Sequence, residues 1–198
     1  MKNRFGVDLD PNKEVFSLVG SKEGISNLMR FLITQKDTDK DVIMIPDPCY
    51  ASYIQFIQCA GGLAYPMPLT KENNYMPNFD EVYENFIKDG HNPKNLKALV
   101  INYPNNPLGV SATREYVQTA IDFCKKHKIL LISDLAYLTK LPNMLSTTIC
   151  HISGIPMYFI SFCISFDKCF FIIRKPFSIY MRASSGSPIS HKSDAISL

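Results

Sequence analysis

The stretch KALVINYPNNPLGVSATREYVQTAIDFCKKHKILLISD, residues 97–134, decides the fold class of this chain. Its two short apolar runs, 97–102 and 129–133, predict strands that are buried on both faces. Between them, residues 113–128 predict a helix whose cationic last turn suits the negative end of the helix dipole. Two such strands joined through a helix predict a right-handed crossover and a parallel pair.

The same alternation of strands and helices extends toward the N-terminus. Ser21 is a preferred N-cap residue and predicts a helix over about 23–35 with an apolar face. The paired glycines Gly61 and Gly62 predict the end of a second helix. The remaining predicted elements are a strand at 41–46, a helix at 50–62, an extended segment at 63–69 and a helix at 79–90. The sequence therefore predicts an α/β protein with a mainly parallel sheet flanked by helices.

Composition narrows the class of function. A chain of 198 residues suits one domain, and a net charge of +3 is too small to indicate a nucleic-acid or anionic membrane surface. The six cysteines form no CxxC pair and no cluster with zinc-ligand spacing, so we expect no metal site. Reduced thiols of this kind are typical of a cytoplasmic protein. The N-terminus lacks the apolar run of a secretory signal.

The chain divides in composition near residue 140. Residues 1–140 carry all but two of the 18 acidic residues, whereas 141–198 are rich in serine and phenylalanine and show no clear helical or alternating period. We expect 1–140 to be a partial enzyme domain and 141–198 to be an atypical tail. The uncharged run 152–166 is shorter than the roughly 20 residues that a spanning helix needs, so a membrane segment is the less favoured interpretation.

Unusual residues follow four of the predicted strands, where the ligands of parallel sheets bind. The four segments are GSKEG at 20–24, PDPCYASY at 46–53, NYPNNPLG at 102–109 and SDLAY at 133–137. The first offers a glycine, a hydroxyl and free helix amides, which suit a phosphate, although an ordinary capped helix has the same features. The third is too elaborate for a simple strand-to-helix turn.

Two of these segments present a single conspicuous side chain. Tyr50 follows a strand next to a proline, and its alternative interpretation is a plain loop aromatic. Asp134 follows an all-apolar strand directly, and burial of its carboxylate costs free energy unless it meets a cation. A helix N-cap is the alternative role for Asp134.

Taken in order, the four segments resemble the large domain of pyridoxal-phosphate enzymes of the aspartate aminotransferase superfamily. The words LVGSKEGI, PDPCYASY, YPMPLTKENNYMP and INYPNNPLG are similar to those of the LL-diaminopimelate aminotransferase branch, which serves lysine biosynthesis. The resemblance covers roughly residues 4–139. It implies the large domain of a fold-type I enzyme, pyridoxal 5′-phosphate as cofactor, and transfer of an amino group between an amino acid and 2-oxoglutarate. It also implies a homodimer in the cytoplasm, or in a plastid for a full-length form, with no nucleic-acid or membrane partner.

The resemblance also implies a role for each matched residue. The cofactor phosphate would be held by Ser21 and Lys22, the pyridine ring would stack on Tyr50, and its phenolic oxygen would accept hydrogen bonds from Asn106 and Tyr137. The Asp134 carboxylate would face the pyridine nitrogen and keep it protonated. A protonated ring withdraws electrons from the α-carbon of the substrate.

The family's reaction also needs a lysine that binds the cofactor covalently and moves a proton. In the family this lysine follows Asp-x-x-Tyr by about thirty residues, in a string such as Ser-x-Ser-Lys-Thr. Lys168 lies thirty-one residues after Tyr137 and three after Ser165, but its other neighbours differ, so it is a weak candidate. The adjacent Asp167 would raise the amine pKa, which opposes nucleophilic attack.

Further departures concern the length of the chain. Leu108 stands where the family has threonine, and the resemblance leaves no N-terminal arm and no C-terminal small domain. The sequence therefore predicts an aminotransferase truncated at both ends, with 141–198 hypothesised to be foreign to the family. The alternative function is a catalytically inactive fragment that retains only the cofactor-binding core.

Overall fold

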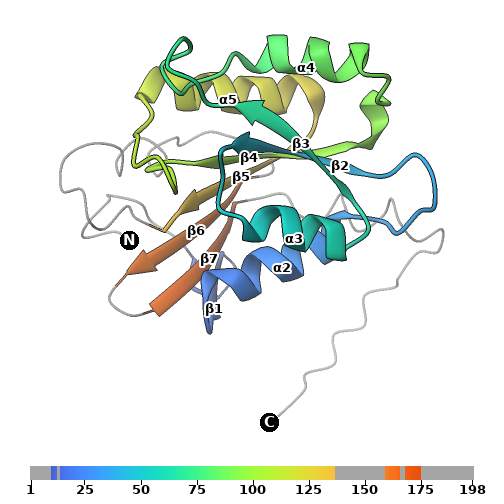
Figure 1. Cartoon of the computed structure of the whole chain (residues 1–198). Coiled ribbons are helices and arrows are strands. Elements are labelled where there is room, and N and C mark those ends of the chain that lie inside the picture. The colour runs from blue at the N-terminus through green and yellow to red at the C-terminus, as the bar shows by residue number, and fades with distance from the viewer. Residues whose placement is uncertain (1–9, 13, 137–158, 166–167, 175–198) are drawn as a thin grey trace.

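The computed structural model describes residues 10–12 and 14–136, together with the backbone of 159–165 and 168–174. Seven strands form one sheet in the order β1-β7-β6-β5-β4-β2-β3, with helices on both faces (Figure 1). The strands are β1 Val15–Leu18, β2 Val42–Asp47, β3 Leu63–Pro68, β4 Leu96–Asn102, β5 Leu130–Leu135, β6 Phe159–Ser165 and β7 Lys168–Arg174. The helices are α2 Ser21–Leu32, α3 Ser52–Cys59, α4 Phe79–Lys88, the short 3-10 turn η1 Pro93–Asn95 and α5 Arg114–His127.

The centre of the sheet is parallel, as the sequence predicts. β2 pairs in parallel with β3 and β4, β4 with β5, and β5 with β6. β7 is antiparallel to both β6 and β1. Because parallel neighbours end at the same edge, the carboxyl ends of β2, β4 and β5 bring three of the polar segments together.

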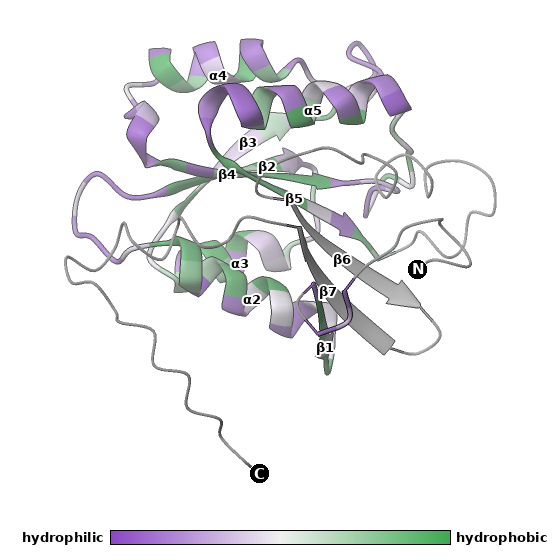
Figure 2. Cartoon of the chain, turned by 180° about the vertical axis from the view of Figure 1, so that it is seen from behind, coloured by the Kyte–Doolittle hydropathy of each residue, from purple (hydrophilic) through white to green (hydrophobic). Residues whose placement is uncertain are grey.

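Two apolar layers explain the continuous apolar runs of the strands. Alternate residues of β2, β4 and β5 pack under α2 and α3, and the intervening residues pack under α4 and α5. Figure 2 shows hydrophobic residues along β4 and hydrophilic residues on the outer turns of α4 and α5. Among the described residues, no helix is both long and apolar enough to cross a membrane.

The helix ends follow local capping chemistry, with one correction. Asn78 accepts from two amides at the start of α4, Thr113 caps α5, and Gly61 takes a positive φ of 89° after α3. The prediction of Ser21 as an N-cap is wrong. The cap is the extended Gly20, and α2 begins at Ser21 and ends at Leu32, without a side-chain cap.

The segment 141–198 contributes to the sheet. β6 and β7 form an antiparallel hairpin, and β6 lies beside β5 while β7 lies beside β1. Two strands therefore form within this segment, although its sequence shows no clear helical or alternating period. The predicted boundary at residue 140 stays a prediction.

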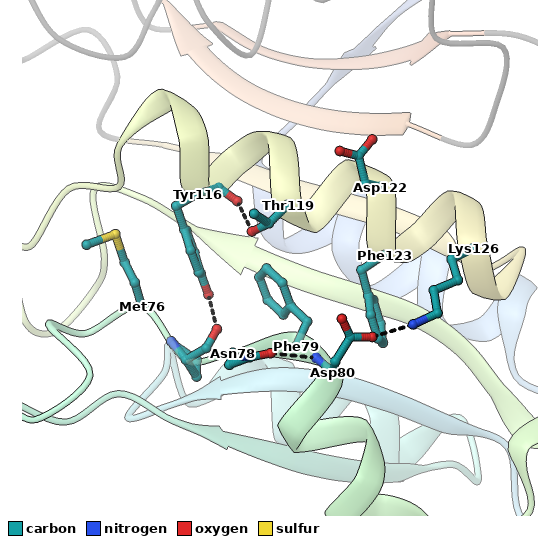
Figure 3. Close-up of a pocket in the computed structure, with 10 residues that line it drawn as sticks. Met76, Asn78, Phe79, Asp80, Tyr116, Thr119, Asp122, Phe123 and Lys126 are labelled. Carbon is teal, nitrogen blue, oxygen red and sulfur yellow. Dashed lines mark hydrogen bonds and ion pairs between the residues drawn. The ribbon is translucent and has the colours of Figure 1, made fainter.

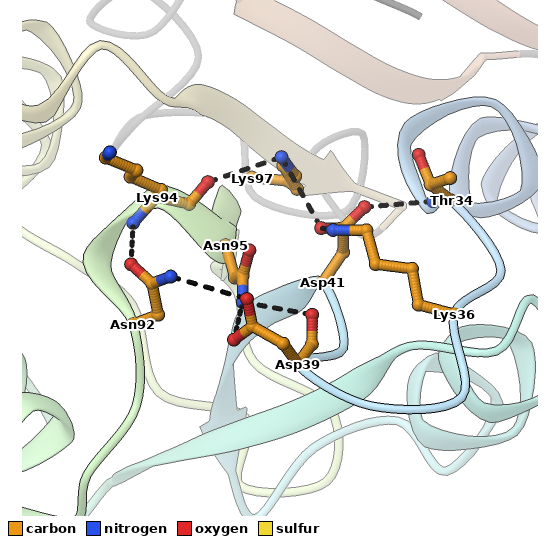
Figure 4. Close-up of polar contacts among 8 residues, drawn as sticks. All are labelled: Thr34, Lys36, Asp39, Asp41, Asn92, Lys94, Asn95 and Lys97. Carbon is orange, nitrogen blue, oxygen red and sulfur yellow. Dashed lines mark hydrogen bonds and ion pairs between the residues drawn. The ribbon is translucent and has the colours of Figure 1, made fainter.

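The carboxylate of Asp41 anchors the amino end of β2 (Figure 4). It is fully buried and accepts from the Thr34 amide at 2.9 Å and from the Lys36 amine at 2.8 Å. The amine of Lys97, from the start of β4, lies 3.4 Å away. Thr34 and Lys36 lie in the connection that follows α2, so one carboxylate joins that connection to two strands.

A second polar cluster closes the same end of the sheet. The Asn95 amide donates to the Asp39 carboxylate and, at 3.0 Å, to the Asp39 carbonyl. Asn92 adds a longer bond to the other Asp39 oxygen and caps η1 (Figure 4). These bonds hold the 33–41 connection against the turn that enters β4.

At one edge of the sheet lies β3, whose sequence is LAYPMP. The amide of Leu63 donates to the Asp41 carbonyl, and the amide of Leu69, just past the strand, donates to the Asp47 carbonyl. These odd-numbered amides point toward β2.

Candidate active site

Asp134 forms the centre of the candidate site. It lies near the carboxyl end of β5, in register with Asn102 of β4, and is 5% exposed. Its Oδ2 accepts from the Tyr53 hydroxyl at 2.5 Å, and its Oδ1 accepts from the Ala136 amide at 3.0 Å. Because Tyr53 belongs to α3, the carboxylate faces the side of the sheet that α2 and α3 cover.

The buried carboxylate of Asp134 has no paired cation among the residues whose side chains are described. Burial raises its pKa, and the bonds from Tyr53 and Ala136 only partly oppose that effect. A cationic N–H group placed here would stabilise the ionised form.

Asn102 joins the two central segments of the site. Its side-chain nitrogen donates to the Asp134 carbonyl at 3.1 Å, and its Oδ1 accepts from the Asn106 amide at 2.9 Å. Asn102 is 1% exposed, so both bonds are protected from water. The asparagine loop after β4 is thereby held at a fixed position beside the carboxyl end of β5.

Tyr50 and Lys22 complete the group on the α2–α3 side. The rings of Tyr50 and Tyr53 meet edge to face, with centroids 5.7 Å apart. The Lys22 amine lies 5.8 Å from the centroid of the Tyr50 ring. A hydrogen bond from Ser52, with a further contribution from Lys22, lowers the pKa of the Tyr50 phenol.

The start of α2 remains a candidate phosphate site. Ser21 is its first residue, and the cap Gly20 provides no side-chain acceptor for the helix amides. No atom of the described residues beyond its chain neighbours lies within 4 Å of the position that a Cβ on Gly20 would take. Open amides, a hydroxyl and the adjacent Lys22 amine match the donors that a phosphate takes. The role of Ser21 stays a prediction, since none of its side-chain contacts tests it.

The structure thus joins most of the predicted residues through one chain of contacts. Lys22 contacts Tyr50, Tyr50 contacts Tyr53, and Tyr53 binds Asp134. From Asp134 the chain continues through Asn102 to Asn106. The predicted residue Tyr137 lies outside the described residues.

Lys168 lies at the same edge of the sheet as Asp134. It is the first residue of β7, opposite Ser165, the last residue of β6. The register places Asp134 beside Phe162 and Phe162 beside Phe171, so Lys168 is two strands away and three residues further toward the carboxyl edge. Ordinary strand spacing and rise give roughly 14 Å between the two α-carbons.

The described residues fit pyridoxal phosphate on the chemistry of their donors and acceptors. A buried carboxylate lacking a cation suits a pyridinium nitrogen, and an aromatic ring beside it suits stacking. An open helix start beside Lys22 suits a phosphate. Among the described residues, no cluster of metal-ligating side chains competes with this interpretation.

A separate pocket of about 480 Å³ lies on the opposite side of the sheet (Figure 3). It lies between the first turn of α4 and the outer face of α5, over the rings of Phe79, Tyr116 and Phe123. An exposed ion pair between Lys126 and Asp80, at 2.7 Å, closes one end. None of the candidate site residues lines it.

Two residues of the candidate site escape prediction from the sequence. Tyr53 looks like one more apolar residue of α3, although its spacing of three from Tyr50 places both near one helix face. Asn102 looks like the last residue of a strand, and only its register with Asp134 reveals its role. Asn73, which lies in the matched word YPMPLTKENNYMP, has a structural role: its side chain accepts from the Thr70 amide and donates to the Pro68 carbonyl.

The described fold and site define a class of protein. Residues 1–155 match the family model of aminotransferase class I and II, and the chain belongs to that family. Its structural neighbours are fold-type I aminotransferases, and the family depends on pyridoxal phosphate. One is a probable N-succinyldiaminopimelate aminotransferase from Thermus thermophilus, with a TM-score of 0.69 and 26% identity, over 86% of this chain and 45% of that one. BacF from Bacillus subtilis has a TM-score of 0.71 and 26% identity, over 86% of this chain and 43% of that one.

Relatives of known sequence indicate one branch of the family. LL-diaminopimelate aminotransferase 2 of Trichormus variabilis is 41% identical over 138 residues, which are 69% of this chain and 33% of the relative. LL-diaminopimelate aminotransferase of Aquifex aeolicus is 39% identical over 136 residues, again 69% and 33%. The chain therefore spans about a third of the length of these relatives.

Proposed function

We propose that this chain carries the cofactor-binding core of a pyridoxal-phosphate aminotransferase of the LL-diaminopimelate type. The observation that carries the proposal is the contact chain from Lys22 to Asn106 around the buried Asp134. Lys22, Tyr50, Asp134 and Asn106 on this chain each match a chemical feature of the cofactor. The names of the similar relatives supply the substrate class. The reaction would transfer an amino group from a diamino diacid to 2-oxoglutarate.

The roles of the side chains follow from their positions. Lys22 and Ser21 would bind the phosphate at the start of α2, where the helix dipole favours an anion. Tyr50 would orient the ring by stacking, and Asn106 would donate to its phenolic oxygen. Asp134 would hold a proton on the ring nitrogen, because a carboxylate favours an adjacent cation. When bound, the cofactor supplies an electron sink for the bonds to the substrate α-carbon.

Lys168 is the lysine that we propose for the covalent link to the cofactor. The position of its backbone at the carboxyl edge, next to the strand beside β5, supports this proposal. Ser165 three residues before it agrees with the family's string, whereas Asp167 does not. An amine serves as a nucleophile or base only when it is deprotonated, so a free carboxylate beside it would slow the reaction.

A second candidate function is cofactor binding without turnover. The differences around Lys168, where Asp167 replaces the serine of the family's string, favour this alternative. Binding residues at one end of a sheet can hold the cofactor even when no amino-group transfer follows. The two candidates differ in whether the bound cofactor becomes linked to Lys168 and exchanges amino groups.

Addition of pyridoxal phosphate to the full chain tests both candidates. We expect saturable binding, a visible absorbance band that borohydride reduction removes, and a phosphopyridoxyl group on Lys168 in a peptide digest. The Lys168→Ala variant should bind the cofactor but lose the label. Binding without label in the wild type would favour the inactive core, and the absence of any binding would refute the proposal.

The remaining elements of the proposal concern setting and assembly. The enzyme would act in the cytoplasm on small amino and oxo acids, and would pair as a homodimer. Sedimentation of the chain with and without pyridoxal phosphate measures the assembly state. A monomer under both conditions would contradict the proposed dimer.

A further inference from the structure

One side chain contacts both residues that are expected to face the pyridine ring. Tyr53 is 1% exposed, and its hydroxyl donates to Asp134 Oδ2 at 2.5 Å. The edge of its ring meets the Tyr50 ring at an interplanar angle of 85°. Tyr53 therefore lies where the direction of the Asp134 carboxylate and the plane of the Tyr50 ring are set together.

The carboxylate of Asp134 accepts one hydrogen bond from the backbone and one from the Tyr53 side chain. Oδ1 accepts from the backbone amide of Ala136, a bond that any residue at position 136 except proline could supply. Oδ2 receives the Tyr53 hydroxyl, the one side-chain donor to this carboxylate among the residues whose side chains are described. Two donors on different oxygens fix the plane of the carboxylate, so loss of the hydroxyl would free one oxygen.

The charged and titratable neighbours do not replace this donor. Burial, followed by the proximity of Asp47, raises the pKa of the Cys49 thiol to about 11, so the thiol is neutral. Lys22 lies over the Tyr50 ring on the α2 side. Burial, followed by the nearby Asp134, raises the pKa of Tyr53 well above its ordinary value, so its hydroxyl keeps its proton and donates at every pH of interest.

We propose that Tyr53 is a positioning residue, which keeps the buried Asp134 ionised and aimed at the ring nitrogen of the cofactor and holds the stacking face of Tyr50. This inference rests on the proposed function for the identity of the ligand. The contact that carries it is a property of the protein alone. It goes beyond the roles that the resemblance implies, because Tyr53 would act only through Asp134 and Tyr50.

The test uses the full chain and the variant Tyr53→Phe, which retains the ring and removes only the hydroxyl. Tyr65→Phe is the matched control, since Tyr65 donates to the Asp89 carboxylate at 2.7 Å away from the site. The probe is pyridoxamine 5′-phosphate, which binds without a covalent link, and its affinity is measured by fluorescence across pH. In parallel, carbon-13 NMR of labelled aspartate follows the protonation of Asp134 in the unliganded protein.

We expect Tyr53→Phe to bind the probe at least about tenfold more weakly at neutral pH, the effect of losing a buried hydrogen bond to a charged group. The pH below which affinity falls should move upward by about one unit, since the carboxylate then protonates more readily. Tyr65→Phe should match the wild type in both respects. A purely structural role would leave the pH profile unchanged.

Three outcomes are distinguishable. A wild type and a Tyr53→Phe variant with the same affinity and the same pH profile would overturn the inference and leave the proposed function standing. Failure of every protein to bind the probe would overturn the proposed function. The NMR titration would then decide the inference: an upward shift of the Asp134 pKa in the variant supports the coupling, and an unchanged pKa overturns it.

Discussion

Replacement of Asp41 by asparagine provides a sharp test of how the sheet is anchored. The substitution retains the size of the side chain and an oxygen that can accept from Thr34, but it removes the charge that faces two lysine amines at 2.8 and 3.4 Å. Removal of one partner from a buried ion pair typically costs about 3–5 kcal/mol. The lysine side chains are 35% and 23% exposed, so water recovers part of the loss, and we expect about 2–3 kcal/mol.

Urea unfolding of the full chain, followed by circular dichroism, measures this loss. The control is Asp80→Asn, which removes an ion pair at 2.7 Å whose partners are 61% and 62% exposed. An exposed pair contributes at most about 1 kcal/mol, so the control should unfold near the wild type. Equal effects of the two substitutions would refute the reasoning that burial determines the contribution.

The pH dependence of stability supplies an independent check. Hydrogen bonds from Lys36 and Thr34, together with the charge of Lys97, outweigh the effect of burial and lower the pKa of Asp41 below its ordinary value of 3.8. A lowered pKa means that the stabilisation is fully present above the pKa of the unfolded chain. It is lost as the pH falls through the lower pKa of the folded state. The difference between wild type and Asp41→Asn should therefore persist at pH 5–8 and vanish in strong acid.

Three further substitutions test other parts of the structure. Gly62→Ala would place a carbon 2.7 Å from the Ile33 side chain and 3.1 Å from the Asp41 carbonyl, so we expect a loss of about 1–2 kcal/mol in thermal unfolding, and an unchanged melting temperature would contradict this. Asn102→Ala removes two buried hydrogen bonds, which should cost about 2 kcal/mol in urea and weaken binding of pyridoxamine phosphate. Lys22→Gln should weaken that binding about tenfold at low salt and less at high salt, and salt-independent loss would argue against a phosphate contact.

The apolar runs of the sequence predict the parallel sheet because β2, β4 and β5 are covered on both faces and need no alternation. The sequence does not reveal β6 and β7, because their runs lack a helix-linked pattern around them. The sequence places the start of α2 about two residues too late. Serine is a preferred cap residue, but here Ser21 is the first residue of the helix. Gly20 takes the cap position, and the Glu23 side chain accepts from the Val19 amide just before it.

Some residues of the candidate site can be predicted from the sequence and others cannot. Asp134 and Asn106 stand out in the sequence because an acid or a constrained asparagine after an apolar strand needs a reason. Tyr53 and Asn102 do not stand out, because their partners are 81 and 32 residues away in the chain. Which face of a strand a side chain takes, and which loop it meets, depends on the register between strands.

The outermost strand of the sheet has a consequence for how copies of this protein can meet. The amides of Leu63 and Leu69 donate toward β2, so the even-numbered positions of β3 turn their amides away from the sheet. Two of the three even-numbered residues of β3 are prolines, Pro66 and Pro68. Proline has no amide hydrogen to offer. An incoming strand would find too few donors along this border to form a ladder, so growth of the sheet into fibres or strand-exchanged pairs is blocked there.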